Sequence, residues 1–370
     1  MVDRYLMDGH KLNWHYERVN EWLKGERIAP LHIDVGLSKG CNIKCHYCFG
    51  QLQGNKYSKG KNVIFPREAL LKYMEDAGKV GVKSIAIIGE AEPTLNSSLY
   101  DAIIKGAESG VDMALGTNGI LFEPTRDVLR NLVWIRFNIS AASEMSYRKL
   151  HSSKNFSKVA ENVLKTVKLK KENNLGVTVG LQMVLTPKDI YEAIPLAKLG
   201  KEWGVDYFVI KQCSDTLESD LGVTEKYSLY KNFEDTLREA ELQSTDDYDV
   251  TVKWNKIREG TSRDYENCFG APFLLYSAGD GRLFPCGSFF NPEYWDDFLM
   301  GDLTKDSFVD ILKSERYWGV VKRVEEMGII KTCYAGCKSH KINSYLWKLK
   351  EENRFLDKPD GDLPPHVNFI

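Results

Sequence analysis

Three cysteines near the start of the chain have the residue type and spacing best suited to chemistry. Cys41, Cys45 and Cys48 stand in the run GLSKGCNIKCHYCFG with the spacing C-x3-C-x2-C. One short loop with this spacing can wrap three thiolates round a single iron–sulfur cluster. Three ligands leave one iron open to an exogenous group, whereas four cysteines would close the cluster. A zinc site is the alternative, with His46 as a fourth ligand.

The same motif carries a family resemblance. With the aromatic Tyr47 directly before the third cysteine, it closely resembles the signature of the radical S-adenosylmethionine (radical SAM) superfamily. The resemblance implies a [4Fe–4S] cluster whose open iron chelates the amino and carboxylate groups of SAM. In that family one electron breaks the sulfonium C–S bond, and the resulting 5′-deoxyadenosyl radical abstracts hydrogen from the substrate. A cellular donor such as flavodoxin or ferredoxin would supply the electron.

Further positions match this family along the chain. The segment GEAEPTL resembles its Gly-Gly-Glu-Pro motif, so Glu92 would meet the ammonium group of SAM, although Glu90 and Ala91 stand at the two glycine positions. The resemblance gives the other cofactor-binding candidates as Tyr47, Thr117, Asn118, Ser140, Arg148 and Gln182. Arg148 is a candidate because a guanidinium can hold a carboxylate through two hydrogen bonds; a solvated helix charge is its alternative.

Four later cysteines form a second group. Cys268 and Cys286 flank a hairpin-like stretch that contains Gly281, in the spacing C-x12-G-x4-C, and Cys333 and Cys337 follow as C-x3-C. The pattern resembles the auxiliary-cluster domains called SPASM and, in shortened form, Twitch. It implies one auxiliary [4Fe–4S] cluster closed by four thiolates. Structural zinc is again the alternative.

The remaining cysteine, Cys213, follows a predicted strand in FVIKQCSD. Buried packing explains most free cysteines. At the mouth of a barrel, however, the thiol could donate a hydrogen atom to a substrate radical, as a cysteine does in related epimerases.

The order of predicted elements indicates the scaffold that positions these residues. Residues 33–212 alternate short β-rich runs with amphipathic helical segments, which is typical of a parallel sheet covered by helices. The predicted strands are 33–37, 84–88, 113–116, 134–139, 178–184 and 207–210, and the predicted helices include 66–79, 156–171 and 189–203. Six such units predict an α/β fold, a partial (βα)6 TIM-like barrel with its chemistry at the carboxyl ends of the strands.

The remaining segments complete the predicted domain organisation. We expect an N-terminal extension (1–30), the partial barrel (31–215), a helical linker (216–261), a small cysteine-rich SPASM/Twitch-like domain (262–345) and a tail (346–370). The prolines of GDLPPHVNFI predict an extended tail. We expect it to pack as a terminus, with His366 near the active site as the alternative.

Composition limits the classes of partner. The 370 residues carry 50 Lys+Arg against 52 Asp+Glu, a net charge of -2, so no bulk field favours nucleic acid or an anionic membrane. No apolar run approaches the roughly 20 residues of a membrane span, and the N-terminus lacks the apolar core of a signal peptide. We therefore expect a cytoplasmic protein. In that reducing compartment the 8 cysteines favour metal ligation over disulfides.

Together these features predict an enzyme, an oxidoreductase that dehydrogenates or otherwise remodels a small hydroxylated metabolite of the sugar or aminocyclitol type. The auxiliary cluster would accept an electron. One alternative is epimerisation with Cys213 as hydrogen donor. Another is maturation of a ribosomally made peptide, ranked lower because residues 1–30 are too few for a winged-helix leader-binding module. A non-catalytic scaffold or zinc-binding regulator would need no cofactor pocket.

Overall fold

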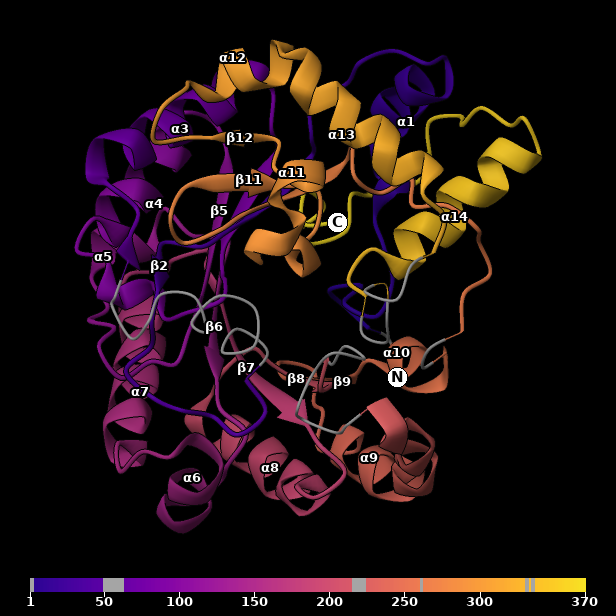
Figure 1. Ribbon diagram of the computed structural model, residues 1–370. Helices are drawn as coiled ribbons and strands as arrows, with labels where there is room; N and C mark the ends of the chain where they lie inside the picture. Colours follow the sequence, from indigo (N-terminus) through magenta and orange to yellow (C-terminus); the bar gives the residue numbers. More distant parts are fainter. Residues whose placement is uncertain (1–2, 49–62, 215–223, 260–261, 330–332, 334–336) are drawn as a thin grey trace.

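A curved, mostly parallel sheet forms the centre of the protein. The computed structural model describes residues 3–48, 63–214, 224–259, 262–329, 333 and 337–370. Its strands are β1 His32–Val35, β2 Ser38–Lys39, β3 Val63–Ile64, β4 Ser84–Ile87, β5 Asp112–Thr117, β6 Trp134–Asn138, β7 Thr178–Leu185, β8 Tyr207–Gln212, β9 Asp249–Val252, β10 Leu274–Ser277, β11 Arg282–Phe284 and β12 Gly301–Asp302. The main sheet has the order β12-β11-β10-β1-β4-β5-β6-β7-β8-β9, and every pairing from β10 to β9 is parallel (Figure 1).

Helices cover the outer face of this sheet (Figure 1). They are α3 Arg67–Val80, α4 Leu99–Glu108, α5 Arg126–Leu129, α6 Glu144–His151, α7 Phe156–Glu172 and α8 Ala193–Trp203. Gly81 and Gly204 end α3 and α8 in left-handed conformations, with φ of 88° and 70°, which glycine adopts without strain. The predicted partial (βα)6 barrel is therefore confirmed, and the six predicted strands correspond to β1 and β4 to β8, with shifts only at their ends.

The inner face of the barrel carries polar side chains beside a small apolar cluster round Trp134. On β6, Ile135 and Phe137 belong to the apolar core beneath the helices, whereas Trp134, Arg136 and Asn138 line a central cavity. Successive side chains of a strand point to opposite faces, so each strand contributes one set to the core and the other to the interior. The barrel interior is consequently a binding cavity and not a packed core.

The segment 216–261, expected as a helical linker, also contains a strand. Its described elements are η4 Thr224–Phe233, α9 Glu234–Glu241, β9 and α10 Trp254–Glu259. Strand β9 pairs with β8 and lengthens the sheet at one edge, whereas β10, from the cysteine-rich region, pairs with β1 at the other. Both cysteine groups thus belong to segments attached to one sheet.

The cysteine-rich region adds further short elements. These are η5 Gly287–Phe289, η6 Pro292–Tyr294, α11 Trp295–Phe298, α12 Phe308–Lys313, α13 Glu315–Glu326 and α14 His340–Glu351, and the barrel loops carry η2 Pro93–Leu95 and η3 Ile190–Glu192. Helix α12 packs beside α3, where the rings of Phe308 and Tyr73 lie edge to face with centroids 5.0 Å apart. Among the described residues no helix is long and apolar enough to cross a bilayer.

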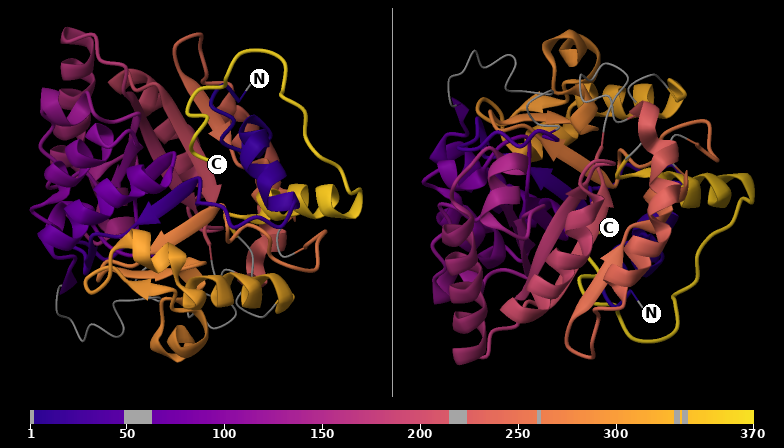
Figure 2. Two further views of the ribbon diagram at one scale, coloured as in Figure 1. Left: turned by 90° about the horizontal axis from the view of Figure 1, so that it is seen from above. Right: turned by 90° about the horizontal axis from the view of Figure 1, so that it is seen from below.

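The two ends of the chain run together (Figure 2). The N-terminal segment contains η1 Leu12–His15 and α1 Tyr16–Leu23, and Lys11 Nζ donates to the backbone oxygens of Pro365 (3.1 Å) and His366 (3.0 Å). His366 Nε2 lies 2.9 Å from Thr178 Oγ1, and Asn368 Nδ2 donates to Asp112. Since Thr178 and Asp112 begin β7 and β5, the tail packs against the amino ends of the strands, opposite the edge where the first cysteines lie.

Candidate active site

The first cysteine group lies on a loop that follows β1 and β2. Backbone bonds fix this loop: Lys44 N donates to His151 O, and Cys48 N donates to Cys45 O at 3.1 Å. The thiols of Cys41, Cys45 and Cys48 all line the central cavity. The structure therefore brings the three predicted ligands together at the carboxyl end of the barrel.

Their environment favours a bound group that takes thiolates. Burial raises the pKa of Cys41 to about 11 and raises that of Cys45 further, because the uncompensated anion would sit in a poorly solvated loop. The all-thiolate donor set, open to a cavity, fits an iron–sulfur cluster.

Glu92 is anchored beside this loop. Its Oε1 accepts hydrogen bonds from Thr94 N, Thr94 Oγ1 and Thr117 Oγ1 (2.6 Å), and its Oε2 accepts one from Asn118 N (2.7 Å). Burial raises the pKa of Glu92, and these donors oppose that shift. Because Oε2 accepts one bond among the described residues, it keeps a lone pair for a cationic ligand. Thr117 and Asn118 therefore orient Glu92, and Asn118 Nδ2 also lies 3.8 Å from Cys41 Sγ.

Tyr47 and Ser140 form a second support of the loop. Ser140 Oγ donates to the hydroxyl of Tyr47 at 2.8 Å and accepts from Val184 N at 3.0 Å. Both residues are buried, and Tyr47 also lines the cavity. Gln182, on β7, lines the cavity as well and donates from Nε2 to Asn138 Oδ1 at 2.8 Å. These three candidates thus lie at or directly beneath the site.

Arg148 lies elsewhere. It is exposed on α6 and does not line the cavity. The residue of that helix that reaches the loop is His151, which the sequence reasoning missed. Its Nδ1 lies 3.1 Å from Cys45 Sγ and its Nε2 accepts from Ser140 N at 3.0 Å. The helical phase explains the difference, since Tyr147 and His151, four residues apart, share the inward face.

Cys213 is buried beneath the cluster-binding loop. Its Sγ lies 3.6 Å from the backbone oxygen of Tyr47 and 3.4 Å from that of Ser214. Ser214 lines the cavity, and Cys213 does not. This placement favours packing, and the role of hydrogen donor stays a prediction.

The second cysteine group faces the same cavity from the cysteine-rich region. Cys268, Cys286, Cys333 and Cys337 all line it. Burial, together with the nearby Cys337, raises the pKa of Cys268 to about 12 and does the same for Cys286. Asn343 Nδ2 on α14 donates to Cys268 Sγ at 3.4 Å. Four neighbouring thiols with a supporting amide fit a closed auxiliary cluster.

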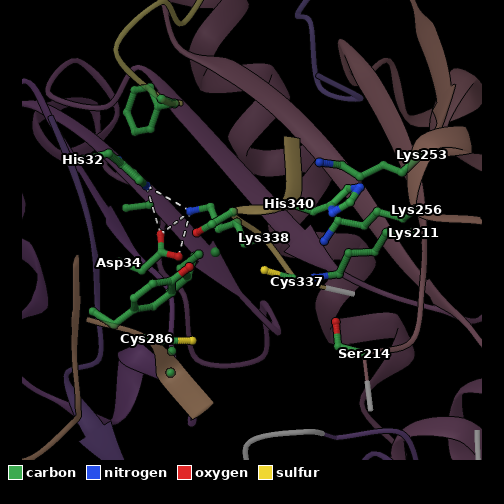
Figure 3. A pocket seen from close by; sticks show the side chains of 18 of the residues that line it. His32, Asp34, Lys211, Ser214, Lys253, Lys256, Cys286, Cys337, Lys338 and His340 are labelled. Atoms are coloured by element: carbon green, nitrogen blue, oxygen red, sulfur yellow. Dashed lines mark hydrogen bonds and ion pairs between the residues drawn. The ribbon is translucent and has the colours of Figure 1, made fainter. Parts of the chain in front are cut away.

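An ion pair that the sequence did not reveal joins the barrel to this group. Lys338, directly after Cys337, donates to both carboxylate oxygens of Asp34 at 2.8 and 2.7 Å and lies 3.1 Å from His32 Nε2 (Figure 3). Burial alone would raise the pKa of Asp34, but Lys338 and His32 hold it well below its ordinary value. This pair fixes the loop of Cys337 to β1.

Glu90 is the unusual residue of the GEAEPTL segment. It is buried, and burial raises its pKa to about 7, against the attraction of Lys39, whose Nζ lies 3.6 Å away. The neighbouring Gly89 sits where an added Cβ would come within 2.8 Å of Gly36 Cα. The ends of β1 and β4 therefore approach closely at Gly89, and the Glu90 side chain turns into the cavity beside them.

The cysteines of both groups surround one cavity of about 600 Å³, together with Tyr47, Glu90, Glu92, Asn118, Gln182 and Lys338. Its walls come from the inner face of the barrel, the first cysteine loop and the second cysteine group. Figure 3 shows one part of it, where Asp34 and Lys338 stand opposite Lys211, Lys253 and Lys256. Cavities of roughly 300–1,000 Å³ are typical of small-molecule sites.

Comparison with known proteins agrees with this geometry. Residues 35–200 match the Radical SAM superfamily. The GTP 3′,8-cyclase of Helicobacter pylori is 32% identical over 124 residues, which are 33% of this chain and 38% of the cyclase. The chain thus spans less than half the length of that relative.

Two solved structures share the fold over most of the chain. Streptococcus suis SuiB bound to precursor peptide SuiA is 15% identical, covers 83% of this chain and 70% of SuiB, and has a TM-score of 0.59. The structure of anSMEcpe with bound AdoMet is 17% identical, covers 88% of this chain and 97% of that one, and has a TM-score of 0.56.

The family predicted from the cysteine spacing is therefore confirmed for residues 35–200, which match the Radical SAM superfamily. This match implies a [4Fe–4S] cluster and SAM as cofactors, and Cys41, Cys45 and Cys48 are the residues here that fit the cluster.

Proposed function

We propose that the protein is a radical SAM oxidoreductase that removes hydrogen from a small hydroxylated metabolite of the sugar or aminocyclitol type. One observation carries the proposal: a single cavity is lined by the cysteines of both groups. A substrate between them could meet a radical on one side and an electron acceptor on the other. The volume of about 600 Å³ favours a small substrate.

Different residues of the chain would hold the two clusters and SAM. When bound, SAM and its cluster supply the hydrogen-abstracting radical, and an auxiliary cluster supplies an electron acceptor. Cys41, Cys45 and Cys48 would hold the first cluster, and Cys268, Cys286, Cys333 and Cys337 would hold the auxiliary cluster of a SPASM/Twitch-like region. Glu92 would accept the ammonium group of SAM through its remaining lone pair, and Tyr47 would close the loop over the cofactor.

The test begins with the anaerobically purified and reconstituted protein. Two clusters predict about eight irons per chain, and the variant Cys268→Ala/Cys286→Ala should keep about four. This double variant should still form 5′-deoxyadenosine on reduction with dithionite or flavodoxin but should not oxidise substrate. The substrate panel contains sugars, aminocyclitols and GTP, the last because of the cyclase relative. A wild-type protein with about four irons contradicts the proposal.

Peptide maturation is a second candidate. The likeness in fold to SuiB bound to its precursor peptide favours it, over 83% of this chain. The enzyme would then change the mass of a small peptide encoded beside it. A pull-down with products of neighbouring small reading frames, followed by mass spectrometry of the captured peptide, separates this candidate from metabolite oxidation.

Epimerisation would depend on Cys213. Its test is deuterium uptake from heavy water into product, with loss of uptake in Cys213→Ala. Because Cys213 is buried under Tyr47, we expect no uptake.

A further inference from the structure

Three lysines lie together on one wall of the cavity, and we call them the lysine cluster. Lys211 belongs to β8, Lys253 directly follows β9, and Lys256 lies on α10. Figure 3 shows their side chains extending into the cavity opposite Asp34 and Lys338. Arg136, on the inner face of β6, lines the same cavity, and its charge acts on Lys211 and Lys253.

The side chains of Lys211, Lys253 and Arg136 on this wall are poorly compensated. Within the part of the chain that the structure describes, the amines of Lys211 and Lys253 donate no hydrogen bond and form no ion pair. Protein surrounds both side chains, and both line the cavity. The Nε of Arg136 is buried and likewise has no partner among the described residues.

Two carboxylates that line the cavity, Asp34 and Glu92, are engaged elsewhere. Asp34 is paired with Lys338 at 2.7 Å, and Glu92 is bound by Thr117 and Asn118. Asp8 attracts Lys253 and Lys256, but its carboxylate also accepts from Asn255 N at 3.0 Å.

Basic groups that a bound anion would keep protonated therefore face the cavity. Burial, with the charges of Arg136 and Lys256, lowers the pKa of Lys211 to about 7. Buried cations without counter-charges cost free energy, so a ligand that brings negative charge would relieve this cost. A phosphate ester carries about -1.5 to -2 charge at neutral pH and three acceptor oxygens, whereas a carboxylate carries one charge. Several converging cations match the phosphate better.

We propose that the lysine cluster and Arg136 bind a phosphate group of the substrate, so that the enzyme acts on a phosphate ester of a hydroxylated metabolite. This inference rests on the proposed function and adds the chemical class of its substrate. The phosphate would anchor the molecule on the wall of β8 and α10 and leave its hydroxylated part free to reach the first cysteine loop.

Isothermal titration calorimetry of the reconstituted protein with SAM, at constant ionic strength, tests the proposal. The probes are inorganic phosphate and pyrophosphate, with acetate as control. We expect phosphate and pyrophosphate to bind more tightly than acetate. Lys211→Met and Lys253→Met should each weaken binding roughly tenfold to a hundredfold, since each removes a charge-assisted hydrogen bond. Lys198→Met, exposed on α8, is the matched control and should change nothing. Equal binding of acetate, or unchanged affinity in the double variant, overturns the proposal.

A competition experiment distinguishes a site for a phosphate ester from a site for a free anion. A panel of sugar phosphates should displace pyrophosphate, whereas the same sugars without phosphate should not; displacement by neither means that the site takes a free anion and overturns the ester assignment. If the double variant does not fold, the melting temperature of the wild type tests the proposal. Pyrophosphate must then raise this temperature more than acetate does, and an equal effect overturns the proposal.

Iron content and 5′-deoxyadenosine formation are measured on the same samples. SAM cleavage without phosphate binding refutes this inference alone, whereas phosphate binding without SAM cleavage refutes the proposed function and leaves only the phosphate site.

Discussion

His151 is predicted to tune the cluster held by Cys45. The backbone N–H of Ser140 donates to Nε2 of His151 at 3.0 Å, so Nε2 must be the acceptor and the ring proton must lie on Nδ1. That proton faces Cys45 Sγ at 3.1 Å. Hydrogen bonds to the sulfurs raise the reduction potential of such clusters, because they stabilise the more negative reduced state. His151→Phe keeps the ring but removes this donor.

The expected size of the effect follows from these contacts. A hydrogen bond to a charged group contributes about 1.5–3 kcal/mol. Both redox states of the cluster gain from this bond, so only part of its energy differs between the oxidised and the reduced state. A difference of about 1 kcal/mol corresponds to about 40 mV for a one-electron couple. The variant should therefore lower the potential by roughly 40 mV. It also leaves the buried Ser140 N–H without its acceptor, which should lower the free energy of unfolding by about 1–3 kcal/mol.

An anaerobic redox titration followed by electron paramagnetic resonance measures this shift, using the signal that changes when SAM is added. Tyr147→Phe is the matched control. Its ring stacks on His151 with centroids 4.3 Å apart, and its buried hydroxyl has no hydrogen-bond partner among the described residues. The control should leave the potential unchanged. An unchanged or higher potential in His151→Phe would refute the assigned tautomer and the contact with Cys45.

Three further predictions concern stability. Burial raises the pKa of Glu90 to about 7, so the folded chain keeps a proton that the unfolded chain releases near its ordinary value of 4.5. The free energy of unfolding should therefore fall between pH 5 and 7 by at most about 3 kcal/mol in the wild type and not in Glu90→Gln, as measured by urea denaturation; parallel curves would contradict this. Asp34→Asn should lower that free energy by about 1–3 kcal/mol, because Lys338 loses its partner yet keeps some contact with water, and adding Lys338→Met should restore part of the loss. Deleting residues 364–370 removes the packing of Phe369 on Trp134 and should cost about 2–4 kcal/mol, which thermal unfolding would register; an unaltered melting temperature would show that the tail does not stabilise the barrel.

The strands of the barrel core could be predicted because they are short, apolar and rich in β-branched residues. Strand β9 was missed because its four residues, Asp249–Val252, begin with an acid and stand in a charged segment that suggested helix. Strand β10 lies in the stretch predicted to be hairpin-like and pairs antiparallel with β11, but its pairing with β1 was not predicted, because it joins residues far apart in the sequence. Local pattern carries no information on such pairings.

The gathering of the cysteines and Glu92 round one cavity could be predicted because their motifs are local and specific. His151 could also have been predicted, since Tyr147 and His151 lie four residues apart on one helix face. Arg148 was preferred because of its charge, although it lies on another face of the helix. The alternation of Trp134, Arg136 and Asn138 along β6 likewise indicated a polar inner face. The pairing of Asp34 with Lys338 could not be predicted, because only the folded chain brings residues so distant in sequence together.

Cys41, Cys45 and Cys48 are proposed to hold an open cluster at which SAM is cleaved. The most direct measurement is 5′-deoxyadenosine formation by the reduced protein, with iron counted in the same sample. The wild type should form this product and the triple alanine variant should form none, while keeping about four irons on the second cysteine group. Undiminished product formation by the triple variant would contradict it.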